Sequence, residues 1–207
     1  GDEVLLTDPT YAGMINRVRL AGGIPRLAPF VHRNGQWSLD LNRLVDAINN
    51  STRVLFIMNP SMPSGAVLSR PEWEFIAKLC ISHDCWLLYN AAMERILYDD
   101  RPYLHPASLP GMAERTLVIG SMSKSHAMTG SRCGWIIGPE DIIADLIDLA
   151  THTNYGVPGF IQDASDYALA QGAAFEEENV IGVLFHPEKS GDAGLRILRN
   201  FVDKVGA

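Results

Sequence analysis

The sequence predicts an α/β fold, specifically a three-layer α/β/α sandwich around a mostly parallel sheet. Continuous apolar runs, such as Val-Leu-Phe-Ile-Met at 54–58, suit strands that are buried on both faces of a parallel sheet. Segments with apolar residues at i, i+3, i+4 and i+7, such as 40–49, suit helices. The two kinds of segment alternate along the chain, which is typical of this fold class. With 207 residues and 47 % apolar side chains, the chain can bury one sizeable core.

The amino-terminal half is expected to alternate strands with helices. Glycines at 22–23 end the first helix. Ser69 and Glu72 have the spacing of a capping box, and Pro71 falls in the first turn, so a helix begins there. The expected order is strand 4–6, helix 12–22, strand 25–30, helix 40–49, strand 54–58, a helix from 69–72 onward and strand 85–89.

The second half is expected to contain two strands, 116–120 and 135–138, joined by a polar turn. Helices follow at 140–151 and 161–171, where apolar residues recur at helical spacing or alanine is frequent. The composition changes from about Asn179, and 172–179, which holds three consecutive glutamates, is the candidate linker. We therefore expect a domain at 1–172 and a linker and tail at 173–207.

Charge and cysteine content restrict the class of partner. The net charge of -7 argues against a nucleic acid or an anionic membrane surface, since both would require a basic face. The three cysteines form no CxxC pair, so neither a disulfide framework nor a zinc site is predicted. No apolar run reaches the roughly 18 residues of a membrane span, and the first residues do not resemble a signal peptide. We expect a cytoplasmic protein that acts on small molecules.

The segment 121–135, SMSKSHAMTGSRCGW, contains the strongest candidate for chemistry. Lys124 follows a strand directly, at the place where open α/β sheets commonly carry functional groups. Its amine can form a Schiff base with an aldehyde. Ser121, Ser123 and Arg132 add two hydroxyl groups and a planar cation that could hold a phosphate dianion. These residue types together suggest pyridoxal 5'-phosphate as cofactor, whereas a solvated loop lysine is the alternative when Lys124 is taken alone.

The same segment resembles the cofactor-lysine signature of class I/II aminotransferases, in which Ser-x-Ser-Lys is followed after seven residues by Arg-x-Gly. Asp8-Pro9-Thr10-Tyr11 and the loop 59–65, NPSMPSG, resemble two further motifs of that family. The resemblance implies that Lys124 is the catalytic, cofactor-bound lysine and that Ser121, Ser123 and Arg132 bind the phosphate. It also implies that Tyr11 stacks on the cofactor ring and that Asn59 donates to its phenolic oxygen. From the residues alone, Tyr11 at a core edge and Asn59 in an ordinary proline-rich turn remain alternatives.

The chain departs from the family at Asn90, where the matching pattern has aspartate, and at Met93, where tyrosine is common. That aspartate stabilises the protonated ring nitrogen of the cofactor, and a neutral amide offers little Coulombic support. We therefore expect impaired transamination, and Asn90→Asp should raise the turnover. A functional substitution, a degenerating gene and a sequencing error all remain open as explanations.

The tail resembles the carboxyl-terminal end of class I glutamine amidotransferases, especially the glutaminase subunit of imidazole glycerol phosphate synthase. The motif Phe-His-Pro-Glu places His186 and Glu188 at two positions of that family's Cys-His-Glu triad. None of the three cysteines lies in the Gly-x-Cys-x-Gly turn that such a nucleophile requires. Glutaminase activity is therefore not expected, and a fused or misassembled reading frame is the favoured explanation.

The resemblance implies a partial large domain of an aminotransferase that moves an amino group from an amino acid to a 2-oxo acid. The full-length parent would be a homodimer, by the same resemblance. By the same resemblance, we expect an amino-terminal phosphate-binding loop and a carboxyl-terminal substrate domain that these 207 residues do not contain. A non-catalytic fragment, chimeric product or binding module is therefore the alternative.

Overall fold

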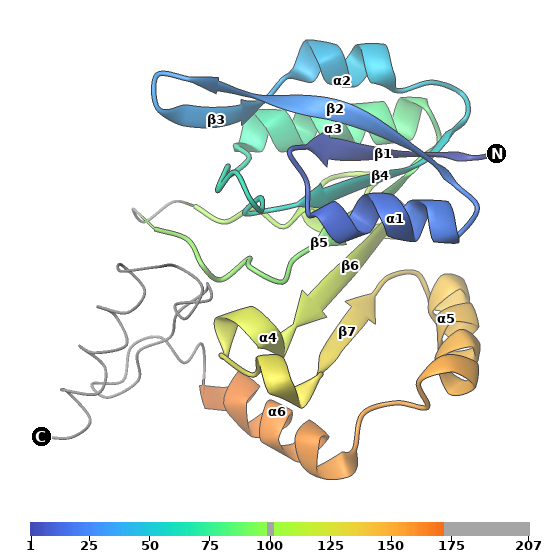
Figure 1. The fold of residues 1–207 in the computed structure, drawn as a ribbon, viewed down its shortest axis with the longest axis vertical. Coiled ribbons are helices and arrows are strands. Elements are labelled where there is room, and N and C mark those ends of the chain that lie inside the picture. Colours follow the sequence, from blue (N-terminus) through green and yellow to red (C-terminus); the bar gives the residue numbers. More distant parts are fainter. Residues whose placement is uncertain (99–101, 172–207) are drawn as a thin grey trace, which may run out of the picture. The chain divides into compact units, whose positions relative to one another are not determined.

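The computed structural model describes residues 1–98 and 102–171, and within them the chain forms a seven-stranded sheet. The strand order is β3-β2-β1-β4-β5-β6-β7 (Figure 1). The strands are β1 (Glu3–Asp8), β2 (Ile24–Arg33), β3 (Gln36–Leu39), β4 (Thr52–Met58), β5 (Trp86–Asn90), β6 (Thr116–Ser121) and β7 (Gly134–Ile137).

Helices precede or follow most of these strands. The α-helices are α1 (Ala12–Leu20), α2 (Leu41–Ala47), α3 (Arg70–Ser82), α4 (Met122–Ser125), α5 (Glu140–Thr153) and α6 (Gly159–Gln171). Three short 3₁₀ helices are η1 (Pro106–Ser108), η2 (Ala113–Arg115) and η3 (Thr129–Ser131). None of the helices in the described residues is long and apolar enough to cross a membrane.

The contacts divide the chain into two compact units. Unit 1 comprises Gly1–Gly120 and Gly134–Gly156, and it contains the sheet and the helices α1, α2, α3 and α5. Unit 2 comprises Ser121–Cys133 and the chain from Val157 onward, and its described part contains α4, η3 and α6.

The sheet of unit 1 is mostly parallel, as the sequence predicts. β1 runs parallel to β2 and β4, β4 runs parallel to β5, and β5 runs parallel to β6. Only β3 is antiparallel to its neighbour β2 among the pairs with an assigned register. Parallel strands place their carboxyl ends at one edge of a sheet, where ligands of open α/β proteins commonly bind. We call this side of unit 1 the carboxyl edge.

Two apolar clusters cover the two faces of the sheet, and together they produce the predicted three layers. Successive strand residues alternate between them, because side chains of a strand point to opposite faces. Leu55 of β4 belongs to the larger cluster, which includes Trp73 of α3, whereas the adjacent Phe56 belongs to the smaller cluster with Val18 of α1. Figure 1 shows α2 and α3 on one side of the sheet and α1 on the other.

The predicted boundary of the second strand was wrong. β2 continues past residue 30 to Arg33 and returns as β3 through a two-residue turn at Asn34 and Gly35. Both turn residues have positive φ, 51° and 77°, as in the tight hairpin turns that favour Asn-Gly. The Asn-Gly pair was the sequence signal that would have revealed this hairpin.

The expected helix starting at Ser69 is confirmed by its cap. The Glu72 carboxylate accepts hydrogen bonds from the Ser69 backbone N–H at 2.7 Å and from its hydroxyl at 2.6 Å. The expected linker at 172–179 and the tail with His186 and Glu188 lie outside the described residues.

Candidate functional site

Two of the predicted cofactor-binding residues lie together at the carboxyl edge of unit 1. Asn59 directly follows β4 and Asn90 is the last residue of β5, the neighbouring strand. The Asn59 backbone N–H donates to the Asn90 carbonyl at 3.4 Å. The structure therefore brings these two amide side chains to adjacent strand ends, as a shared binding site would require.

The Asn59 side chain is almost fully buried and is held in one orientation. Its Oδ1 accepts a hydrogen bond from the Leu68 backbone N–H at 2.8 Å, and only 3 % of the residue is exposed. Its Nδ2 donates to none of the described residues at full hydrogen-bond distance, although the Asn59 side chain lies close enough to the Tyr89 hydroxyl to lower the pKa of that group. A buried amide donor of this kind needs a partner, so Asn59 is fitted to donate to a ligand oxygen at this edge.

Asn90 presents a different donor pattern from that of a carboxylate. Its Oδ1 accepts from the Ala92 backbone N–H at 3.0 Å, so its Nδ2 is the group left to face a ligand. A donor beside a ring nitrogen favours the unprotonated nitrogen, whereas a carboxylate favours the protonated one. Met93, which stands where the family commonly has tyrosine, packs against the smaller apolar cluster.

Tyr11 lies near the end of β1, the strand next to β4, at the amino-terminal cap position of α1. Its side chain is 41 % exposed, and the Arg17 guanidinium lies 5.5 Å from the ring centroid. The ring thus has a cation against one face and retains exposed surface for stacking. Among the described residues, no hydrogen bond or ring contact joins Tyr11 to Asn59 or Asn90.

In unit 2, the lysine segment is a single helical turn, and the predicted simple polar turn was wrong. The Ser121 hydroxyl accepts a hydrogen bond from the Ser123 backbone N–H at 3.1 Å. This is the bond by which a serine caps a helix, so α4 begins at Met122 directly after β6. Lys124 lies in this turn and is half-buried.

The charged groups of the lysine segment are arranged by local hydrogen bonds. The Arg132 guanidinium donates to the Thr129 carbonyl at 2.9 Å, and the Thr129 hydroxyl donates to the Ser123 carbonyl at 2.8 Å. Arg132 itself has the left-handed backbone conformation, with φ 55° and ψ 37°. The Lys124 amine makes no hydrogen bond or ion pair to the part of the chain that the structure describes. An unengaged amine close in sequence to hydroxyl groups and a guanidinium is the donor set that a phosphorylated aldehyde requires.

The predicted residues therefore fall into two groups. Tyr11, Asn59 and Asn90 belong to unit 1, while the lysine segment with Ser121, Lys124 and Arg132 belongs to unit 2. Chain connectivity relates them, because Ser121 is both the last residue of β6 and the first of unit 2. Their convergence on one cofactor remains a prediction.

Sequence reasoning missed a hydrogen-bond network that begins at Asn59 and runs through the buried Tyr89 to the partly exposed Tyr103. The hydroxyl of Tyr89, a fully buried residue of β5, donates to the Asn59 carbonyl at 3.2 Å and lies 3.3 Å from the Tyr103 hydroxyl. The Tyr103 hydroxyl in turn donates to the Glu94 carboxylate. Burial raises the pKa of Tyr89 to about 12, and it also raises the pKa of Tyr103. A tyrosine in an apolar strand must find such partners, which is the signal that could have revealed it.

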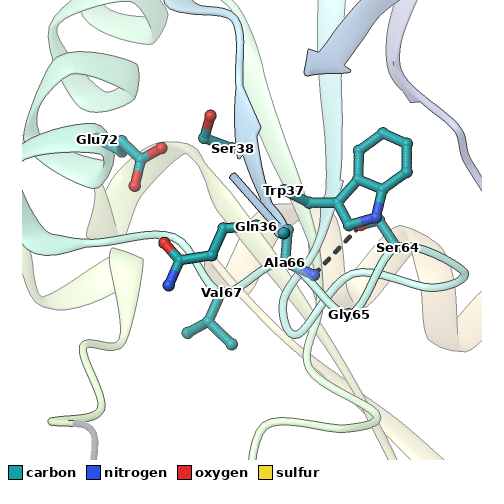
Figure 2. Close-up of a pocket in the computed structure, with 9 residues that line it drawn as sticks. Gln36, Trp37, Ser38, Ser64, Gly65, Ala66, Val67 and Glu72 are labelled. Carbon is teal, nitrogen blue, oxygen red and sulfur yellow. Dashed lines mark hydrogen bonds between the residues drawn. The ribbon is translucent and has the colours of Figure 1, made fainter. Parts of the chain in front are cut away.

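A separate cavity of about 330 Å³ lies between the β2–β3 hairpin and the loop after Asn59 (Figure 2). The hairpin contributes Gln36, Trp37 and Ser38, and Glu72 belongs to α3. On the loop side, the Ala66 backbone N–H donates to the Ser64 hydroxyl at 3.2 Å. None of the predicted cofactor-binding residues lines this cavity.

The chain matches the family model "Aminotransferase class I and II" over residues 1–184. The match continues past residue 172, into the segment assigned to the amidotransferase-like tail. The arginine–pyruvate transaminase AruH of Pseudomonas aeruginosa is 40 % identical over 169 residues, which cover 82 % of this chain and 42 % of the relative. Human kynurenine–oxoglutarate transaminase 1 is 33 % identical over 190 residues, which cover 87 % of this chain and 44 % of the relative.

Solved structures show the same relationship. N-succinyldiaminopimelate aminotransferase from Mycobacterium tuberculosis is similar with a TM-score of 0.79 at 31 % identity, over 100 % of this chain and 50 % of that one. Thermus thermophilus aspartate aminotransferase with maleate is similar with a TM-score of 0.77 at 28 % identity, and the match covers 83 % of this chain and 44 % of that one. The chain spans half or less of the length of these four proteins. It belongs to the class I and II aminotransferase family.

Proposed function

We propose that the protein carrying this chain is a pyridoxal-phosphate-dependent aminotransferase that moves an amino group from an amino acid to a 2-oxo acid. The observation that carries the proposal is the half-buried Lys124 amine. It follows β6 directly and has no partner among the described residues, in a chain that matches the family over residues 1–184.

The chain's residues divide the task of holding the cofactor. Ser121, Ser123 and Arg132 would bind the phosphate through hydroxyl and guanidinium donors. Asn59 would donate from Nδ2 to the phenolic oxygen, since its Oδ1 is already held by Leu68. Tyr11 would stack on one face of the ring, a contact worth about 0.5–1.5 kcal/mol. Asn90 would donate to the ring nitrogen.

The bound cofactor supplies an aldehyde that accepts the amino group and a ring that withdraws electrons. Lys124 would hold the aldehyde carbon of the bound cofactor through its amine. When that amine is free, it would take a proton from the amino acid's α-carbon and deliver it to the second carbon of the transfer. The Asn90 amide leaves the ring nitrogen without a counter-charge, so this proton abstraction should be slow.

The proposed substrates are an amino acid and a 2-oxo acid, because the similar proteins carry names such as arginine–pyruvate and kynurenine–oxoglutarate transaminase. We also propose that the protein is cytoplasmic and that the full-length parent is a homodimer, as the family resemblance implies. The amidotransferase-like tail stays a proposal about residues 173–207. Because none of the three cysteines lies in a Gly-x-Cys-x-Gly sequence, no ammonia release from glutamine is expected.

Substitution of Lys124 by alanine tests the proposal. Wild-type protein should develop the absorption band of a lysine-bound cofactor when pyridoxal phosphate is added, and the band should change when an amino acid follows. Lys124→Ala should show neither effect. Lys78→Ala is the matched control, since Lys78 is an exposed lysine on α3 and should behave as wild type. An unaltered band in Lys124→Ala would contradict the proposal, and a band without any response to amino acids would indicate a binding module.

A further inference from the structure

The hydroxyl of Tyr89 on β5 donates a hydrogen bond to the main-chain carbonyl of Asn59. Asn59 is fixed at its side-chain oxygen by Leu68 and at its main-chain oxygen by the Tyr89 hydroxyl, at 2.8 and 3.2 Å. Both contacts are buried. A residue held at these two points has its remaining donor, Nδ2, aimed in one direction.

The Tyr89 ring is itself held in place by packing. Its ring centroid lies 5.5 Å from that of Trp73 and 5.7 Å from that of His105, at interplanar angles of 83° and 90°. The residue has no exposed surface. Replacing it with phenylalanine would therefore keep the ring contacts and remove only the hydroxyl.

Each of the two tyrosine hydroxyls has one proton to donate. Tyr103 gives its only hydroxyl proton to Glu94, so in the contact between the two tyrosines Tyr89 must be the donor. The single proton of Tyr89 is thus shared between the Asn59 carbonyl at 3.2 Å and the Tyr103 oxygen at 3.3 Å. Tyr103 is a competing acceptor, and removing its hydroxyl would leave the Tyr89 proton to Asn59 alone.

We propose that Tyr89 is a positioning residue, which holds Asn59 so that its Nδ2 is aimed at the cofactor, and that Tyr103 competes with Asn59 for the Tyr89 proton. The inference rests on the proposed function, because Asn59 needs a cofactor to meet.

The test measures the dissociation constant of pyridoxal phosphate for the purified protein in a double-mutant cycle. Tyr89→Phe should weaken binding roughly 2- to 10-fold, the effect of one hydrogen bond. In the Asn59→Ala background the same substitution should change binding less than about 2-fold, since the group it positions is gone. Both single variants should shift the absorption maximum of the bound cofactor in the same direction.

The other variants separate positioning from general structural support. Tyr103→Phe should bind as tightly as wild type or more tightly. Tyr98→Phe, a substitution of an exposed tyrosine, is the control and should change nothing. Unchanged binding in Tyr89→Phe, an equal loss in both backgrounds, or a loss in Tyr103→Phe would overturn the inference.

Two further outcomes are decisive. If Tyr89→Phe does not fold, Tyr103→Phe alone decides. Cofactor binding as tight as in wild type or tighter supports the inference, and weaker binding overturns it. Wild-type protein that fails to bind the cofactor would overturn the proposed function, and the inference would fall with it.

Discussion

Asn90 is the single residue whose chemistry differs most from what the family motif implies. Its oxygen accepts a hydrogen bond from the Ala92 backbone, while its Nδ2 carries two N–H donors that no carboxylate has. The sequence identified this position through the motif, but it could not show which end of the amide is free. The orientation of the amide depends on the backbone turn after β5, because that turn places the Ala92 N–H against the Asn90 oxygen.

Replacing Asn90 with aspartate should raise the transamination turnover at least about tenfold, a difference of about 1.4 kcal/mol in the barrier. The new carboxylate would stabilise the protonated ring nitrogen, which the amide does not do. Turnover with an amino acid and a 2-oxo acid as substrates provides the measurement. Asn42→Asp, which adds the same charge at an exposed position of α2, is the control. An unchanged rate in Asn90→Asp would remove this residue from the mechanism.

Tyr89 makes the stability of the protein depend on pH in the alkaline range. Burial raises the pKa of Tyr89 from 10 to about 12, so the unfolded chain loses this proton at a lower pH than the folded chain does. The unfolding free energy should therefore fall between pH 10 and about 12, by up to about 2–3 kcal/mol. Denaturant titrations across this range test the expectation. Tyr89→Phe should lose less stability over the interval than wild type and Tyr98→Phe do, and identical pH profiles would contradict the assignment.

At the scale of secondary structure, the sequence predicted most elements because their signals are local. The capping box of α3 and the buried run of β4 are two examples, and both elements begin within two residues of the expected position. The β3 strand was missed, although Asn34-Gly35 marks its turn. The α4 turn was missed because it spans only Met122–Ser125, which is too short for a helical period to be detectable.

Gly120 of β6 leaves space for the indole of Trp135 on the neighbouring strand β7. A β-carbon at this position would overlap the indole of Trp135 on β7. Gly120→Ala should therefore lower the unfolding free energy by about 1–3 kcal/mol, the usual effect of overpacking. Gly159→Ala is the matched control, because a β-carbon there meets nothing within 4 Å. Denaturant unfolding compares the two, and equal stability would show that the indole moves aside without cost.

At the scale of the whole molecule, the fold class was predictable but the strand order was not. Alternation of strands and helices indicates a parallel sheet, whereas the order β3-β2-β1-β4-β5-β6-β7 depends on which strands meet in space. The same limit applies to the site. Motifs identified Asn59, Asn90 and Lys124, but the hydrogen bond from Tyr89 to Asn59 joins residues 30 positions apart and has no local signature.

A pyridoxal-phosphate-dependent mechanism in this protein requires that the cofactor be bound to one particular lysine. Reduction of the protein with borohydride in the presence of pyridoxal phosphate, followed by peptide mapping, measures this directly. The predicted result is a stable pyridoxyl group on Lys124, with Lys78 unmodified at stoichiometric cofactor. Modification at Lys78 or elsewhere, with Lys124 left free, would contradict the account.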